Sequence, residues 1–489
     1  MTGDLVVAVD CSTTAAKAVV VDAAGSVVAA ASRPLATATP APGFHEQDAT
    51  SWYDATAAAV AAAVGALGDP ARVGAVCVTH QRESFVLLDE AGVPLRPAIL
   101  WVDSRAHAEI AELGSARVHA ISGKPPDTTP ALYKLAWLAR HEPEALARAA
   151  AVADVQAYLA LRLTGRLATS HASADTLGLF SLERLDWSGE LVALAGLRTD
   201  QLPALVDAGS ALGDLTPAAA RDLGLPAPVP LVAGIGDGQS AGLALGVEEV
   251  GVAYLNLGTS MVCGVTSQEY LTSPAFRTLV GARPGTYVLE TVLNAAAYLA
   301  SWAVRQFGDG DLAATEAAAA LLPVGAEGLL TLPYWNAAQT PYWDPSARGA
   351  VVGWHGRHTP AHLYRSILEG VALELRLQLT ELEQATGTPV SQLRAVGGGA
   401  RSPLWTQIVA DATGREVQVM SDGEVSAAGA AVLAHEFLGH QRTRGWTVGG
   451  SRTPDPDAAG RYDVLYEPYR ELYPALSGVM ATLSRVSGV

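Results

Sequence analysis

Lysine, cysteine and long apolar runs are scarce in this chain of 489 residues. Only three lysines occur, and 32 lysines plus arginines oppose 49 acidic residues, so the formal net charge is −17 at pH 7. An acidic chain repels phosphate backbones and anionic lipid headgroups, which argues against nucleic acid or a membrane surface as a partner. No run of about 18 apolar residues is present that would span a bilayer.

The cysteine usage bears on the compartment. Cys11, Cys77 and Cys263 show no paired spacing, and an odd number of cysteines cannot all pair within one chain. This usage fits a reducing environment. The first residues run almost at once into an apolar strand, without the basic start and apolar core of a signal peptide. We therefore expect a soluble cytoplasmic protein.

Length and patterning indicate an α/β protein of two domains. With 49% hydrophobic and 17% charged residues, the chain can bury more than one core. Apolar runs at 5–9, 18–22, 27–33 and 73–79 predict strands, and residues 360–386 carry a helical pattern. Strands mixed with helices in this order indicate layered α/β domains. A junction at 246–251 precedes a second start of the pattern, so we expect domains at 1–246 and 247–489.

Two turns rich in small hydroxyl residues are the most informative feature. Asp10-Cys11-Ser12-Thr13-Thr14 follows one apolar strand, and Leu257-Gly258-Thr259-Ser260 follows another. Such turns can aim backbone N–H groups and hydroxyls at one anion, and two of them could grip a polyphosphate from opposite sides. Lys17 lies just past the first turn, where it could reach a phosphate. Alternatively, the chain simply favours arginine over lysine throughout, in which case the position of Lys17 has no functional significance.

Two carboxylates stand at the ends of apolar strands. Asp10 could hold Mg²⁺, directly or through water, or could serve only as a turn residue. Asp237 follows the apolar residues 231–236 and could take a proton from a phosphoryl acceptor. It could equally cap the helix that begins there. The pattern alone leaves both alternatives open.

Polar residues also follow the buried strand at 73–79. Arg82 and Glu83, after Gln81, could hydrogen-bond sugar hydroxyls at the carboxyl end of the strand, where ligands bind in α/β domains. They could instead form a solvated ion pair worth about 0–1 kcal/mol. Trp101 and Asp103 could add a stacking face and an acceptor, although Trp101 could equally be packed core.

A glycine run, Gly397-Gly398-Gly399, lies between a predicted strand and a predicted helix. It permits a ligand to approach the backbone closely, but glycine runs often serve only as loops. Nothing in the chain matches a Walker-A sequence, and the run lacks the spacing of a dinucleotide-binding fingerprint.

Taken together, these residues resemble the FGGY carbohydrate kinases over nearly the whole chain. The motifs that carry the likeness share one order: Asp10-Cys11-Ser12-Thr13-Thr14 with Lys17, Gln81-Arg82-Glu83, Trp101 with Asp103, Gly236-Asp237, Leu257-Gly258-Thr259-Ser260, and Gly397-Gly398-Gly399-Ala400-Arg401-Ser402. The resemblance implies an α/β fold with two actin-like (ribonuclease-H-like) ATPase domains around a central cleft. It also implies ATP with Mg²⁺ and phosphorylation of a hydroxyl of a small sugar or polyol.

The resemblance also assigns roles position by position. Asp237 matches the catalytic base and Asp10 the metal-associated carboxylate. The expected nucleotide-binding residues are Ser12, Thr13, Thr14, Lys17, Gly258, Thr259, Gly398, Gly399 and Ser402. The expected substrate-binding residues are Gln81, Arg82, Glu83, Trp101, Asp103 and Asp237. The expected partners are a sugar or polyol and at most a second copy of the chain.

The resemblance points to two different substrates. Arg82-Glu83 is similar to glycerol kinases, which usually carry a tyrosine where this chain has Thr129 and a glutamine where it has Gly238. Ile99-Leu100-Trp101 is similar to xylulokinases, which usually have Met-His at 82–83. Smaller residues at 129 and 238 should enlarge the pocket, so we expect a ketose or polyol of four to six carbons, and among these a pentulose, as in xylulokinases. A glycerol or tetritol kinase is the alternative, and a catalytically silent nucleotide or sugar sensor is the alternative of another class.

Overall fold

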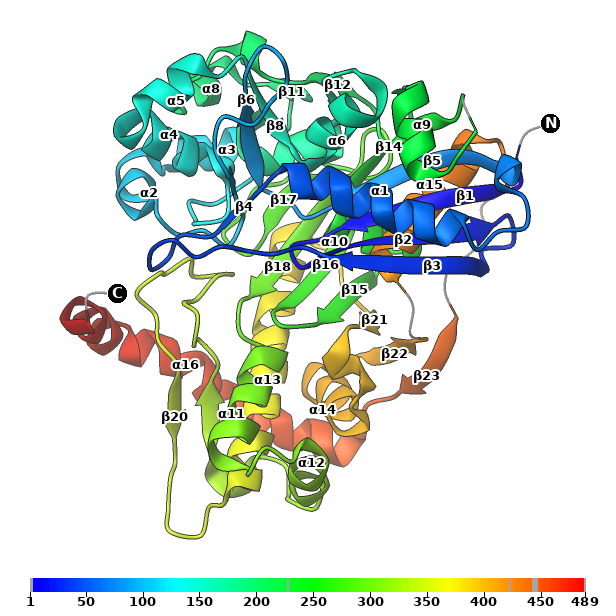
Figure 1. The fold of residues 1–489 in the computed structure, drawn as a ribbon. Coiled ribbons are helices and arrows are strands. Elements are labelled where there is room, and N and C mark those ends of the chain that lie inside the picture. The colour runs from blue at the N-terminus through cyan, green and yellow to red at the C-terminus, as the bar shows by residue number, and fades with distance from the viewer. Residues whose placement is uncertain (1–2, 227, 422–423, 442–446, 488–489) are drawn as a thin grey trace.

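The structure, a computed structural model, describes residues 3–226, 228–421, 424–441 and 447–487. Its two largest sheets lie one in each half of the chain, with helices packed against them (Figure 1). The predicted α/β class is confirmed. Among the described residues, no helix combines the length and the apolar character that crossing a membrane requires.

The N-terminal sheet has six strands in the described chain. In spatial order they are β13 (Ala211–Asp214), β14 (Pro230–Gly236), β5 (Val73–His80), β1 (Leu5–Cys11), β2 (Ala15–Asp22) and β3 (Val27–Pro34). The predicted strands at 5–9, 18–22, 27–33 and 73–79 are confirmed and run one to three residues longer. Strand β1 is buried on both faces, because Val6 and Ala8 pack into one apolar cluster and Val7 and Val9 into another. This explains its nearly continuous apolar sequence.

The C-terminal sheet has seven strands within the described ranges. In spatial order they are β17 (Arg277–Val280), β18 (Tyr287–Leu293), β16 (Met261–Ser267), β15 (Val252–Leu257), β21 (Gln392–Val396), β22 (Glu416–Met420) and β23 (Val448–Arg452). The long helix α13 (Pro360–Thr386) supplies much of the core beside this sheet. Its predicted bounds are confirmed: Pro360 opens it, and Gly387 ends it in the left-handed conformation at φ 66°.

Other helices and short strands complete the two halves. The remaining helices are α1 (Thr50–Val64), α2 (His107–Leu113), α3 (Ala116–Ser122), α4 (Ala131–His141), α5 (Pro143–Arg148), α6 (Val155–Thr164), α7 (His171–Ala174), α8 (Gly189–Leu194), α9 (Pro217–Leu223), α10 (Asp237–Ala244), α11 (Ala297–Phe307), α12 (Leu312–Ala320), α14 (Pro403–Thr413), α15 (Val425–Phe437) and α16 (Pro456–Ser487). The smaller sheets contain β4 (Glu46–Gln47), β7 (Ala98–Ile99), β6 (Phe85–Leu88) and β8 (Ala151–Asp154), then β9 (Ala168–Ser170) with β12 (Ala204–Val206), β10 (Phe180–Ser181) with β11 (Asp186–Trp187), and β19 (Leu330–Leu332) with β20 (Ala350–Val352).

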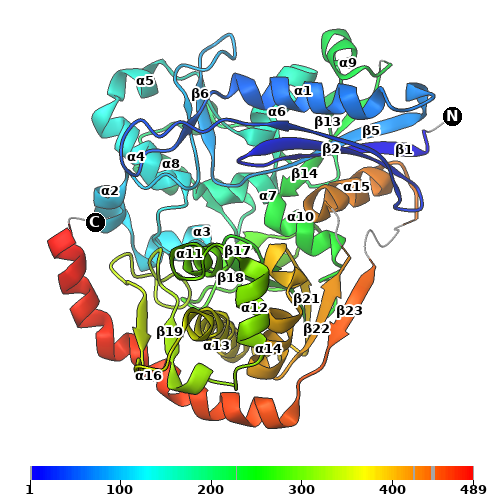
Figure 2. The same cartoon turned by 60° about the horizontal axis from the view of Figure 1, so that its bottom comes forward.

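One helix of the C-terminal half packs on the N-terminal sheet. Helix α15 contacts β1, β5 and α10, and both views place it beside the N-terminal strands (Figures 1 and 2). Helix α16 instead runs along the outer side of the C-terminal half (Figure 2). The predicted junction at 246–251 falls between α10 and β15, and the domain bounds 1–246 and 247–489 stay a prediction.

Candidate active site

Three neighbouring parallel strands bring the predicted catalytic residues to one edge of the N-terminal sheet. Strand β5 pairs in parallel with β1 on one side and with β14 on the other. Asp10 lies opposite Thr79 near the ends of β1 and β5, and Asp237 directly follows β14. The segment Gln81–Glu83 directly follows β5. The carboxyl ends of parallel strands meet at one sheet edge, so these residues converge.

Asp237 presents a carboxylate to a cavity. It is the first residue of α10, and its side chain is 38% exposed. Its Oδ1 atom accepts a hydrogen bond of 2.8 Å from the Gly238 N–H and lies 3.3 Å from Nε of Arg82. Its Oδ2 atom has no hydrogen-bond partner among the described residues. One oxygen is therefore fixed, and the other can receive a proton.

Asp10 is buried and carries an unused oxygen. Burial, followed by the charge of Asp237, raises the pKa of Asp10 to about 8, while Lys17 acts in the opposite direction. Its Oδ1 atom is buried without a hydrogen-bond partner in the described chain. A buried orphan oxygen is unusual unless an ion or water fills the position. The residue therefore suits a cation.

The donor set around Asp10 fits Mg²⁺ in particular. Within the described ranges, no group of three or more His, Cys, Asp or Glu residues is arranged to hold a metal ion. Mg²⁺ does not need such a group, because it usually takes one or two carboxylates and completes its shell with water and substrate phosphates. Asp10, with Asp237 nearby, matches this requirement.

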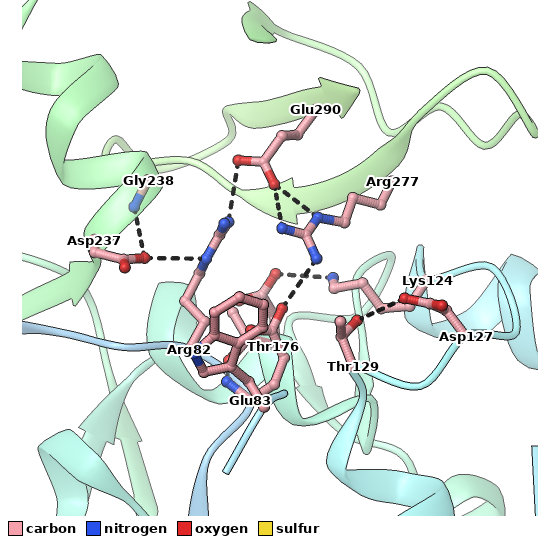
Figure 3. A network of polar contacts seen from close by, with 12 residues as sticks. Arg82, Glu83, Lys124, Asp127, Thr129, Thr176, Asp237, Gly238, Arg277 and Glu290 are labelled. Carbon is pink, nitrogen blue, oxygen red and sulfur yellow. Dashed lines mark hydrogen bonds and ion pairs between the residues drawn. The ribbon is translucent and has the colours of Figure 1, made fainter. Parts of the chain in front are cut away.

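Arg82 and Glu83 join the two halves of the chain instead of forming a solvated pair (Figure 3). Arg82 Nη1 lies 3.1 Å from Glu290 Oε2, on β18 of the C-terminal sheet. Arg277 Nη1, on β17, lies 3.2 Å from Glu83 Oε1. Arg277 also bonds Glu290, with its Nε 2.7 Å from Oε1. Two arginines and two glutamates thus form one ionic network that joins the two halves, and Arg82 connects it to Asp237.

Glu290 is the centre of this network. It is fully buried, and its Oε2 also accepts a hydrogen bond from the Tyr254 hydroxyl. Burial acts to raise its pKa, but Arg277 and Arg82 outweigh burial and lower the pKa to about 2. Glu290 is therefore ionised at neutral pH, with both oxygens saturated by donors. A buried ion pair of this kind depends on both partners, since either charge alone would be strongly unfavourable.

A cavity of about 160 Å³ lies between the two halves at this network. Four of the predicted substrate-binding residues line it: Arg82, Glu83, Trp101 and Asp237. Asp127, Tyr254 and Arg277 are among the lining residues that were not predicted. A charged residue next to apolar residues is a usable signal for both Arg277, which begins β17, and Glu290, which lies inside β18. No comparable signal distinguishes Asp127 in its proline-rich loop.

The lack of a side chain at Gly238 does more than enlarge the pocket, which was its expected effect. It lines the cavity, yet a Cβ atom there would lie 3.1 Å from Arg82 Nη2 and 3.1 Å from Glu290 Oε2. The absent side chain therefore makes room for the Arg82–Glu290 pair as well as for a ligand. Thr129 also lines the cavity, as expected from its smaller size.

Two predicted substrate-binding residues lie behind the cavity wall. Asp103 is fully buried, and its Oδ2 accepts hydrogen bonds from the His45 N–H at 2.6 Å and from Arg105 Nη2 at 2.8 Å. Gln81 is also buried and accepts a hydrogen bond of 3.0 Å from the Thr13 hydroxyl. Neither residue lines the cavity, so any contact of theirs with substrate stays a prediction.

The first hydroxyl turn presents one open side chain. Ser12 donates to the Ala15 carbonyl at 2.8 Å. The Thr13 hydroxyl, already bonded to Gln81, also accepts from Trp101 Nε1 at 2.9 Å. Thr14 is exposed, and its hydroxyl has no partner among the described residues. The turn thus offers Thr14 to a ligand, whereas Ser12 and Thr13 fix its shape.

Lys17, on β2 just after this turn, contacts the other half of the chain. Its Nζ lies 2.9 Å from Glu424 Oε2, just before α15, and both side chains are about two-fifths exposed, at 38% and 44%. Such an exposed pair is weak, about 0–1 kcal/mol. A phosphate could therefore compete with Glu424 for the ammonium group.

The second hydroxyl turn lies beside the glycine run. Strands β15 and β21 are parallel, and Asn256 lies opposite Val396, so Gly258 and Thr259 follow one strand where Gly397 follows the other. The Thr259 side chain is exposed, and its hydroxyl has no partner in the described chain. Its carbonyl accepts from the N–H of Ala296 at the start of α11. This backbone bond fixes the turn and leaves the side chain open.

The glycines of the run are required for different reasons. Gly397 has φ 91°, and a Cβ atom there would lie 2.5 Å from Asn256 Oδ1. A Cβ atom on Gly399 would lie 2.7 Å from the Trp405 ring. A Cβ atom on Gly398 would meet nothing within 4 Å, so only that position faces open space. The protein itself does not require glycine at 398.

A second cavity, of about 190 Å³, borders the glycine run. Gly397, Arg401 and Met420 are among its lining residues. Ser402 caps α14 by accepting from the Trp405 N–H and donates to Glu316 Oε1 at 2.7 Å. Its hydroxyl is therefore already in use, and its predicted contact with adenosine stays a prediction.

Comparison with known proteins identifies relatives over almost the entire chain. Residues 5–244 match the N-terminal domain model, and residues 253–435 the C-terminal domain model, of the FGGY family of carbohydrate kinases. The xylulose kinase of Escherichia coli K12 is 33% identical over 97% of this chain and 100% of its own length.

Two solved structures are also similar. The xylulose kinase of Rhodospirillum rubrum has a TM-score of 0.90 at 31% identity, covering 97% of this chain and 99% of that one. A structure titled as a xyloylose kinase of Brucella ovis has a TM-score of 0.90 at 30% identity, covering 97% and 100%. The expected fold of two actin-like domains is confirmed.

Proposed function

The chain belongs to the FGGY family of carbohydrate kinases, and on that premise we propose that it transfers the γ-phosphate of ATP to a hydroxyl of a pentulose. Phosphotransfer to an alcohol group is the chemistry of this family. The relatives described above are named xylulose kinases, which supports a five-carbon ketose as the acceptor. These names also favour an enzyme over a catalytically silent sensor.

The observation that carries this proposal is the environment of Asp237. Its Oδ1 is held by the Gly238 N–H and Arg82, and its Oδ2 is open to the cavity. A carboxylate fixed in this way accepts the proton of the acceptor hydroxyl as the oxygen attacks the γ-phosphorus. The bond from phosphorus to the leaving oxygen then breaks, and ADP departs.

The remaining residues position the nucleotide. Thr14 and Thr259 offer open hydroxyls from the two turns, and Lys17 offers a cation close to the first turn. Asp10 would hold Mg²⁺, which neutralises charge on the phosphates. Gly398, with open space above its backbone, suits contact with the nucleoside part. Assembly as a homodimer also stays a prediction.

A glycerol or tetritol kinase is the second candidate, and one observation favours it. Arg82 and Glu83, the pair that is similar to glycerol kinases, both line the cavity. Thr129 in place of a tyrosine favours the longer acceptor.

An assay of ADP release decides between these candidates. The purified protein is supplied with ATP and Mg²⁺ and tested against glycerol, tetritols, pentitols, pentuloses and hexuloses. The proposal expects the highest kcat/KM with a pentulose. The best kcat/KM with glycerol would favour the second candidate, and no ADP release with any acceptor would contradict both.

A further inference from the structure

We propose that Asp127 and Thr129 form a second hydroxyl-binding subsite, at the far end of the cavity from Asp237, and that Lys134 is its positioning residue. The inference rests on the proposed function and names what recognises the acceptor beyond the reacting hydroxyl. The family resemblance assigns no role to Asp127 or Lys134.

The positions of the side chains define two ends of the cavity. Figure 3 shows Asp237 on one side and Asp127 with Thr129 on the other, with Arg82 and Arg277 between them. Both Asp127 and Thr129 line the cavity. An acceptor whose first hydroxyl lies at Asp237 would therefore extend past the arginines toward Asp127.

The far end offers unsatisfied acceptor atoms. The Thr129 hydroxyl donates to Asp127 Oδ2 at 3.2 Å, which leaves its lone pairs available. Asp127 Oδ1 has no hydrogen-bond partner among the described residues. A hydroxyl of the acceptor can donate to either oxygen, so this end selects a hydroxyl-bearing carbon.

In the middle of the cavity, one carboxylate oxygen is open to the ligand, and both arginines are paired with carboxylates. Arg277 directs its Nε and Nη2 atoms to Glu290 and its Nη1 to Glu83, and Arg82 binds Glu290 and Asp237. Glu83 Oε2 has no partner in the described chain. Carboxylate oxygens facing the ligand favour neutral hydroxyl donors and repel an acidic acceptor. The predicted class is thus a neutral polyhydroxy compound longer than glycerol.

Lys134 fixes the wall that carries this subsite. The side chain is fully buried on α4, and its Nζ donates to the carbonyls of Thr129 at 2.9 Å, Trp101 at 3.1 Å and Leu100 at 3.2 Å. An ammonium group has three donors, and all three are used. Lys134 therefore ties the loop of Thr129 to the loop of Trp101, which lines the same cavity.

The test compares an acceptor with its own truncated analogue. The analogue lacks the terminal hydroxyl farthest from the phosphorylated one. Asp127→Ala should raise the KM for the pentulose about ten- to a hundredfold, as for loss of a hydrogen bond to a charged group. The kcat and the KM for ATP should change less than about threefold. With the analogue, the variant and the parent enzyme should have the same KM.

Matched variants separate recognition from folding. Thr129→Val keeps the shape of the side chain and should raise the same KM. Thr128→Ala, in the same loop but not among the lining residues, should leave every constant unchanged. Lys134→Met should raise the KM for the pentulose, and in combination with Asp127→Ala its effect should not add, because both act on one subsite.

Several outcomes would overturn the inference. Equal losses of Asp127→Ala on the acceptor and on the analogue would show that the residue only supports the fold, and an unchanged KM for both would show that Asp127 does not bind the acceptor. Additive effects of Lys134→Met and Asp127→Ala on the KM would show that Lys134 does not act through this subsite. If another acceptor is phosphorylated best, the proposed function fails, and the comparison is made with that acceptor. If glycerol is best, the far subsite is unused and the inference is wrong.

Discussion

Replacing Glu290 by glutamine should destabilise the protein by an amount that the structure allows us to estimate. The arginines hold the pKa of Glu290 at about 2, below its ordinary 4.5. A lowered folded-state pKa adds stability that is present above the unfolded value, about 4.5, and is lost as the pH falls through 2. The difference corresponds to about 3 kcal/mol at pH 7, within the range for breaking a buried ion pair.

Urea unfolding followed by tryptophan fluorescence measures this effect. Glu290→Gln should lower the free energy of unfolding by about 3 kcal/mol at pH 7. Glu249→Gln is the control, because Glu249 is 57% exposed beside Arg394 and its loss should cost less than about 1 kcal/mol. A loss for Glu290→Gln no larger than that of the control would refute the reasoning about the interdomain network.

Two further predictions concern the C-terminal half. Gly398→Ala should leave the melting temperature unchanged, because its Cβ would meet nothing within 4 Å, while raising the KM for ATP in steady-state assays; an unchanged KM would remove position 398 from the nucleotide site. Burial raises the pKa of Glu374 to about 7 against donation by Tyr469 and Tyr334, so its contribution to stability is present below pH 4.5 and is lost as the pH rises through 7. Between pH 5 and 8 the parent should lose about 2.5 kcal/mol more unfolding free energy than Glu374→Gln in urea titrations; equal losses would contradict this.

Sequence reasoning succeeds here where local patterns determine geometry. The apolar strands at 5–9 and 73–79 predict β1 and β5, and parallel strands end at one edge of a sheet. The pattern thus places Asp10, Arg82 and Asp237 each just at or after the end of an apolar strand, and the structure adds that these three strands are parallel neighbours. The proline and glycine that bound α13 likewise determine its ends.

Contacts between distant segments are not visible in such patterns. Nothing near Arg82 in the sequence indicates Glu290, more than 200 positions later. The alternative of a solvated ion pair at 82–83 treats those residues as a surface feature, whereas both are buried in the structure. Likewise Asp103 follows a predicted strand as a substrate residue would, but Arg105 and the His45 backbone occupy its carboxylate. Arg105 is a local partner, two residues from Asp103, but only the tertiary fold brings the His45 backbone to this carboxylate.

The proposed phosphoryl transfer depends most directly on Asp237 as the general base. Asp237→Ala, assayed for ADP release with the best acceptor, should lose about a hundred- to ten-thousandfold in kcat, as for removal of a general base. Its dissociation constant for ATP, measured by calorimetry, should stay within about threefold of the parent value, because the hydroxyl turns and the glycine run lie on other elements. A kcat within a few-fold of the parent enzyme would contradict the central claim.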